Sequence, residues 1–134
     1  MNKKKKILFT ILIIILVVIG LFLLSKKQKN WIDNILNNNY EIYTLACDGT
    51  TNILDNNVLK EIKNKWNKLS NNGPFLGELN ICYKKIIINY NNDIADIEII
   101  DRTSLIVKKN NKEDYYTYYT NAGDLITYLN KYFN

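Results

Sequence analysis

The chain has 134 residues and a formal net charge of +5, and it contains no histidine. That length suffices for one small domain in addition to the apolar segment near the N-terminus. Seven of the 18 basic residues flank this segment, so residues 31–134 carry 11 basic and 13 acidic side chains, a net charge of −2. Nucleic-acid binding requires a basic face that displaces counterions from phosphates, and this composition argues against it. The lack of histidine removes the commonest general base and metal ligand.

Residues 7–24 form an apolar run in which Thr10 is the one polar side chain. A helix of this length is about 27 Å long, close to the ~30 Å hydrocarbon core of a bilayer. We predict an uncleaved transmembrane helix, because the run is long and ends at Ser25-Lys26 without the small residues of a signal-peptidase site. The alternative is a cleavable signal peptide. A lipid-attachment cysteine is not expected, since the first cysteine is Cys47.

The lysines on the two flanks of this run predict its orientation. Residues 1–6, predicted as a cytoplasmic tail, contain four lysines and the amino group, whereas three lysines follow the run. Because the more positive flank favours the cytoplasm, we predict a single-pass protein of the cell membrane with an extracytoplasmic domain. The reverse orientation, with the domain in the cytoplasm, is the alternative. Lys26, Lys27 and Trp31 are expected at the membrane interface, and the lipid bilayer is the one predicted partner with a direct sequence signal.

Residues 25–39 are predicted as a juxtamembrane stalk, into which the anchor helix extends as far as Leu36. Residues 40–134 are predicted as one α+β domain. It begins with a strand at residues 40–47, followed by a helix at residues 57–69 whose apolar side chains recur every three or four positions. Asp55 or Asn57 can cap this helix, and residues 70–74 end it.

The second half of the domain has the alternating pattern of antiparallel strands, followed by a helix from Asn121 onward. Asn91-Asn92-Asp93 predicts one hairpin turn, and residues 109–112 predict a second. The predicted strands are residues 79–83, 86–90, 94–100, 104–108 and 114–119. We predict that about four to five of these segments form an antiparallel sheet, which is packed by two helices.

Three local patterns carry a resemblance to a known group of proteins. They are Asp48-Gly49-Thr50, the helix after Asp55, and Tyr115-Tyr116 in a late strand. The domain thereby resembles small uncharacterised membrane-anchored cell-envelope domains of Gram-positive bacteria. The resemblance covers residues 40–134 and implies a strand–helix–meander–helix order in an envelope location, but it assigns no functional residue.

Cys47 and Cys82 are the only cysteines of the chain. If the strands at residues 40–47 and 79–83 are neighbours, the two can form a disulfide. The alternative is a pair of small buried side chains that do not meet. Without histidine, neither a cysteine nucleophile nor a zinc site is expected.

Four acidic residues, Asp93, Asp96, Glu98 and Asp101, crowd the middle of the predicted meander. Carboxylates that converge could bind Ca²⁺ or act as an acid–base pair. The alternation of Asp96 and Glu98 with apolar residues instead predicts a solvated sheet face. We therefore predict no catalytic, metal or cofactor site and a protein that is not an enzyme. A small carboxylate-dependent envelope enzyme is the alternative.

Tyr115, Tyr116, Tyr118 and Tyr119 surround Thr117 in the last predicted strand. In a strand, Tyr115 and Tyr119 share one face while Tyr116 and Tyr118 share the other. Exposed tyrosine pairs are good contact residues for proteins and sugars, although tyrosine is also an ordinary strand former. The predicted function is a non-enzymatic binding module of the cell envelope, with an envelope protein as a candidate partner. The sequence does not predict an oligomeric state.

Overall fold

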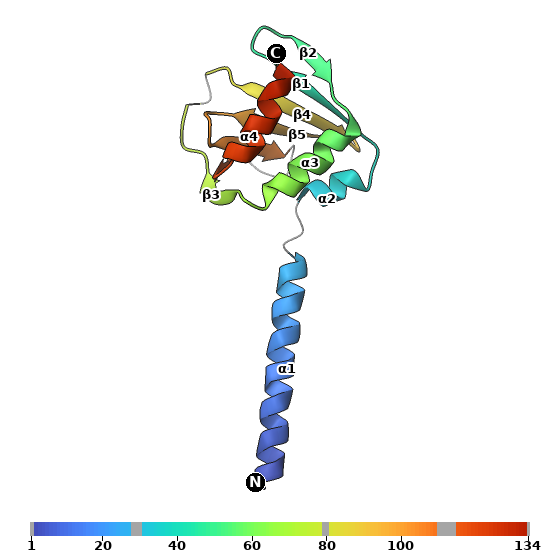
Figure 1. Ribbon diagram of the computed structural model, residues 1–134, viewed down its shortest axis with the longest axis vertical. Helices are drawn as coiled ribbons and strands as arrows, with labels where there is room; N and C mark the ends of the chain where they lie inside the picture. Colours follow the sequence, from blue (N-terminus) through green and yellow to red (C-terminus); the bar gives the residue numbers. More distant parts are fainter. Residues whose placement is uncertain (1, 28–30, 79–80, 110–114, 134) are drawn as a thin grey trace. The chain divides into compact units, whose positions relative to one another are not determined.

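The computed structural model describes residues 2–27, 31–78, 81–109 and 115–133 (Figure 1). The chain forms two compact units, Met1–Trp31 and Ile32–Asn134.

The first unit is the helix α1 (Lys3–Lys27). Within this unit, the apolar side chains of residues 7–19 and 21–23 are exposed. Residues Lys3–Leu23 are long and apolar enough to cross a membrane, and a signal sequence would have the same character. The predicted N-terminal apolar helix is therefore confirmed. Its continuation toward Leu36 crosses residues 28–30, which lie outside the described part of the chain.

A short helix, α2 (Trp31–Leu36), enters the second unit. Ile32 and Ile35 are fully buried, because their three-residue spacing places both on the face that packs into the core. Asp33 forms an ion pair with Lys63 of the next helix. The segment that we expected to be a stalk, residues 25–39, thus contains a helix of the folded unit.

Seven strands form one antiparallel sheet within the described residues, in the order β2-β1-β4-β5-β6-β7-β3. The strands are β1 (Tyr40–Leu45), β2 (Thr51–Ile53), β3 (Ser70–Pro74), β4 (Lys84–Tyr90), β5 (Asp93–Ile99), β6 (Leu105–Lys109) and β7 (Thr117–Thr120). The antiparallel α+β class is confirmed, but the predicted number of four to five strands is wrong.

The sequence pattern missed the two edge strands and misplaced another. β2 is exposed at every position and β3 carries a Gly-Pro pair, so neither shows strand-like alternation. They become strands by pairing with β1 and β7. Conversely, residues 81–83 of the strand predicted at 79–83 are not a strand, and residues 79 and 80 lie outside the described part.

The central hairpin joins β4 and β5 through Asn91 and Asn92. Both asparagines have positive φ, 46° and 64°, the left-handed conformation that a tight two-residue turn requires and that asparagine tolerates. Seven residue pairs continue from this turn, from Tyr90 opposite Asp93 to Lys84 opposite Ile99. The hairpin predicted from Asn91-Asn92-Asp93 is confirmed, and its register fixes which side chains share a face.

Two helices, α3 (Asn56–Trp66) and α4 (Gly123–Asn130), cover one face of the sheet, and a 3₁₀ turn, η1 (Lys131–Phe133), follows α4 (Figure 1). Asp55 caps α3 by accepting a hydrogen bond from the Asn57 backbone N–H at 3.0 Å. The core beneath the helices contains fully buried Ile42, Ile86, Ile88, Ala95, Ile97, Leu59, Ile62, Leu125 and Leu129. We call the opposite face of the sheet the outer face.

Candidate functional site

One row of side chains crosses the outer face from strand to strand. The register aligns Tyr43 of β1 with Ile87 of β4, Asp96 of β5 and Lys108 of β6. Tyr116 follows directly, because its neighbour Thr117 pairs with Val107 of β6. Adjacent strands lie about 4.8 Å apart, so four strand spacings make this row roughly 19 Å long. Close strand pairing thereby gathers aromatic, acidic and basic groups from distant parts of the sequence.

Next to this row lies an ion pair between Lys85 of β4 and Glu98 of β5. They are direct cross-strand partners, with Lys85 Nζ 3.0 Å from Glu98 Oε1. The Glu98 side chain is only 6% exposed, whereas that of Lys85 is 31% exposed. The hydrogen bond to Glu98 raises the pKa of Lys85. The solvated face that we expected for Glu98 is thus wrong, because a neighbouring lysine neutralises a carboxylate that is almost fully buried.

Asp96 is the second carboxylate of the outer face. Burial raises the pKa of Asp96, and Glu98 adds to this effect while the positive charges of Lys85 and Lys108 oppose it. Lys108 Nζ also lies 5.4 Å from the ring centroid of Tyr116. Burial, followed by the charges of Glu98 and Asp96, raises the pKa of the Tyr116 phenol. These acids therefore lie within a charge-balanced network and not opposite each other in a cleft.

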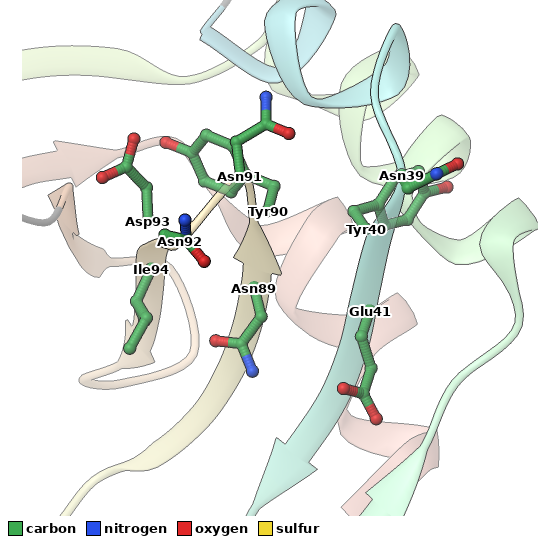
Figure 2. A pocket seen from close by; sticks show the side chains of 9 residues that line it. All are labelled: Asn39, Tyr40, Glu41, Asn89, Tyr90, Asn91, Asn92, Asp93 and Ile94. Carbon is green, nitrogen blue, oxygen red and sulfur yellow. The ribbon is translucent and has the colours of Figure 1, made fainter.

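Two hollows meet at Ile94 of the outer face. The larger, about 540 Å³, surrounds the β4–β5 turn and the start of β1 (Figure 2). Its lining consists of Asn39, Tyr40, Glu41, Asn89, Tyr90, Asn91, Asn92, Asp93 and Ile94. The smaller, about 200 Å³, is lined by Ile94, Asp96, Lys108 and Tyr116. Both are open to solvent, a shape suited to an extended ligand more than to an enclosed small molecule.

The structure separates the four tyrosines of the predicted contact surface. Tyr119 lies beneath α3, with its ring centroid 5.0 Å from that of Trp66. Tyr118 is on the outer face, opposite Ile106, and its ring centroid lies 5.8 Å from that of Phe75. Tyr116 lines the smaller hollow, and Tyr115 is 47% exposed. Of the four, Tyr116 and Tyr118 thus belong to the outer face, and Tyr119 lies half-buried on the helix-covered face.

The sequence pattern did not single out several outer-face residues, among them Tyr43, Glu41, Asn89, Lys85 and Lys108. Each is spaced two residues from another outer-face position on its own strand, so alternation would have grouped them strand by strand. The grouping across strands depends on the register, which the sequence pattern left open.

The acidic residues predicted to crowd the meander are distributed over three places. Asp96 and Glu98 share the outer face, and Asp93 lies at the β4–β5 turn. Asp101 accepts hydrogen bonds from the Thr103 and Ser104 backbone N–H groups at 2.9 and 2.8 Å, which lower its pKa. Among the described residues, no group of three or more His, Cys, Asp and Glu side chains could hold a metal ion.

Cys47 and Cys82 form a disulfide, with their Cα atoms 5.8 Å apart. It links the turn after β1 to the segment that enters β4, and both residues are exposed. The pair lines a third hollow of about 420 Å³ together with residues of β5 and the end of α4.

Of the predicted membrane-interface residues, Trp31 begins α2, and the side chains of Lys26 and Lys27 lie outside the described part of the chain.

Comparison with known proteins gives a fold but no family. No family model and no curated protein matches the chain. A crystal structure of a Clostridium perfringens protein, provisionally described as a lipoprotein, matches with a TM-score of 0.55 at 18% sequence identity. The match covers 77% of this chain and 93% of the Clostridium chain. At this identity the likeness establishes a shared fold. The matched Clostridium protein comes from a Gram-positive bacterium.

Proposed function

We propose that the protein is a membrane-anchored, extracytoplasmic binding module of the cell envelope, with α1 as an uncleaved anchor and the outer face as its contact surface. The Cys47–Cys82 disulfide is the observation that carries this proposal. Disulfides persist outside the cytoplasm and are rare inside it, where thiols are kept reduced. A disulfide-bonded unit attached to a helix of membrane-spanning length therefore favours the outer side of the membrane.

The Clostridium perfringens neighbour supports an envelope location. It is provisionally described as a lipoprotein, a class of proteins found in the cell envelope. The present chain has no cysteine before Cys47, and we assign the role of anchor to its apolar helix.

A binding role is favoured over a carboxylate-dependent enzyme. An acid–base pair requires two carboxyl groups that face a substrate in a water-shielded cleft. Here Glu98 is neutralised by Lys85, and the hollows of the described residues are open. The tyrosines of the row across the outer face instead belong to a residue type that is enriched at contact surfaces.

Topology is tested in cells that express the full-length chain. Cells are treated with a reductant and then with a membrane-impermeant maleimide, before or after lysis. We expect Cys47 and Cys82 to be labelled in intact cells, because both are exposed on the outside. The control is a Cys47→Ser/Cys82→Ser variant, which must remain unlabelled. Labelling that occurs only after lysis would place the domain in the cytoplasm and contradict the proposal.

Anchor retention is tested by the intact mass of the membrane-extracted protein. An uncleaved anchor predicts the mass of the full 134-residue chain, with or without the initiator methionine. A mass that lacks residues up to about position 25 would show that α1 is a signal peptide.

Contact by the outer face is tested with a photo-crosslinking amino acid in place of Tyr116. The matched control carries it in place of Asn64, an exposed position on α3 on the other side of the sheet. We expect a reproducible adduct with an envelope component from position 116 and none from position 64. Equal adducts from both positions, or none from either, would contradict a contact role for the outer face.

A further inference from the structure

We propose that the two hollows form one continuous groove that binds an uncharged sugar chain with hydroxyl and amide groups. The groove consists of the lining residues of both hollows, joined at Ile94. This inference rests on the binding role proposed for the outer face and names the ligand class for that role.

The groove is continuous because its parts lie on adjacent strands. The register places Glu41 of β1 opposite Asn89 of β4, and Asn89 opposite Ile94 of β5. Figure 2 shows the Glu41 and Asn89 side chains extending from neighbouring strands to the same side, with Asn91 at the turn above them. The 540 Å³ hollow lies within the ~300–1,000 Å³ range of ligand sites. The smaller hollow extends it across Asp96 toward Tyr116.

The amide side chains of the groove define the ligand chemistry. Asn39, Asn89, Asn91 and Asn92 each present two donors and an acceptor within a plane, an arrangement that matches neighbouring hydroxyls or an acetamido group. Among the described atoms, Asn89 Oδ1 is buried without a hydrogen-bond partner. A ligand hydroxyl or N–H would satisfy this oxygen once the Asn89 side chain turns it toward the groove.

The charges of the groove disfavour a polyanion. The larger hollow has Glu41 and Asp93 but no lysine or arginine among its described lining residues, so it repels a polyanion. In the smaller hollow, Lys108 offsets the charge of Asp96, so the excess of carboxylates lies in the larger hollow. Hydroxyl groups, by contrast, donate charge-assisted hydrogen bonds to the carboxylates without carrying charge themselves.

Aromatic side chains supply the apolar part of the recognition. Tyr116 lines the smaller hollow, and Tyr40 and Tyr90 are among the lining residues of the larger one. An aromatic ring offers a flat apolar face and, in tyrosine, a hydroxyl at its edge. The C–H faces of sugar rings match that flat surface, so a chain of sugars can use the amides and the tyrosines in succession.

The test uses the full-length chain in nanodiscs of uncharged lipid. Calorimetric titrations are carried out with the tetramer of β-1,4-linked N-acetylglucosamine, with cellotetraose, with poly-L-glutamate and with tetralysine. We expect both sugars to bind, the acetamido sugar more tightly because the asparagines pair with its amides, and no binding of poly-L-glutamate. Tighter binding of tetralysine than of either sugar would overturn the proposal, as would the absence of sugar binding at millimolar concentrations.

Two groove variants locate the sugar. We expect Glu41→Gln and Asn89→Ala each to weaken binding about 3- to 10-fold, the loss that accompanies one or two hydrogen bonds. Glu61→Gln and Asn64→Ala are the matched controls on exposed positions of α3, and they should leave the affinity unchanged. Sugar binding that the groove variants do not weaken, in proteins whose circular dichroism is unaltered, would refute this site.

The outcomes separate this inference from the proposed function. An adduct with a protein at position 116, without sugar binding, would refute the glycan groove and leave the contact role of the outer face intact. The absence of both sugar binding and a site-specific adduct would refute both.

Discussion

Removal of the Cys47–Cys82 disulfide should destabilise the folded unit through the entropy of its unfolded state. The two cysteines are 35 residues apart in the sequence, and closing a loop of that size is worth about 4 kcal/mol in the chain-entropy model. Both side chains are exposed, so a Cys47→Ser/Cys82→Ser variant leaves no cavity in the core. Loss of the cross-link is therefore the dominant effect expected of this double substitution.

The assay is urea unfolding of the full-length chain in detergent micelles, followed by far-ultraviolet circular dichroism, which reports the loss of the sheet and helices of the folded unit. With a urea dependence of about 1.5 kcal/mol per M, a loss of about 4 kcal/mol lowers the unfolding midpoint by roughly 2–3 M. Wild-type protein treated with a reductant should unfold at the midpoint of the double variant. The reductant should not change the double variant itself.

Two results would refute this reasoning. Equal midpoints for oxidised wild type and the double variant would show that the cross-link adds no stability. A large effect of the reductant on the double variant would show that the agent acts on something other than the disulfide.

Three further predictions concern the core, the buried ion pair and the central turn. Trp66→Ala removes a ring packed edge-on against Tyr119 and should cost about 3–5 kcal/mol in urea unfolding, with Asn64→Ala as a nearly neutral control on the same helix. Because the pKa of Lys85 is raised, its interaction with Glu98 contributes its full stability below pH 10.5, the ordinary pKa of the lysine. This contribution is lost as the pH rises through the raised pKa. Glu98→Gln should therefore reduce the loss of stability between pH 10 and 12, and an unchanged pH profile would contradict this role. Asn92 has a φ of 64°, so Asn92→Val should cost about 1–2 kcal/mol whereas Asn92→Gly should preserve the turn, and equal thermal midpoints for the two variants would argue against backbone strain.

Elements with a strong local signal were predictable from the sequence. The apolar run, the β4–β5 hairpin and the helices that became α3 and α4 all follow from periodicity, capping residues or turn residues. Their bounds shifted by a few residues; α3, for example, ends at Trp66, three residues before the predicted end. Local propensity suffices for these elements because each one carries its own apolar pattern, cap or turn residues within a short stretch of sequence.

The candidate site was only partly predictable. Alternation indicated that Tyr116 and Tyr118 share one face, and the structure places both on the outer face. Alternation could not indicate that Lys85 pairs with Glu98, since the two lie on different strands and meet only through the β4–β5 register. For the same reason Glu98 looked solvated in the sequence although it is almost fully buried.

The sequence by itself thus determined the apolar N-terminal helix, the α+β class and the mildly acidic composition of the rest of the chain. These properties depend on composition and short-range periodicity, which each segment carries alone. Tertiary structure decided the edge strands β2 and β3, the burial of α2, the Cys47–Cys82 bond and the groove of the outer face. Each of these depends on contacts between residues far apart in the chain, and such contacts exist only once the strands are ordered and in register.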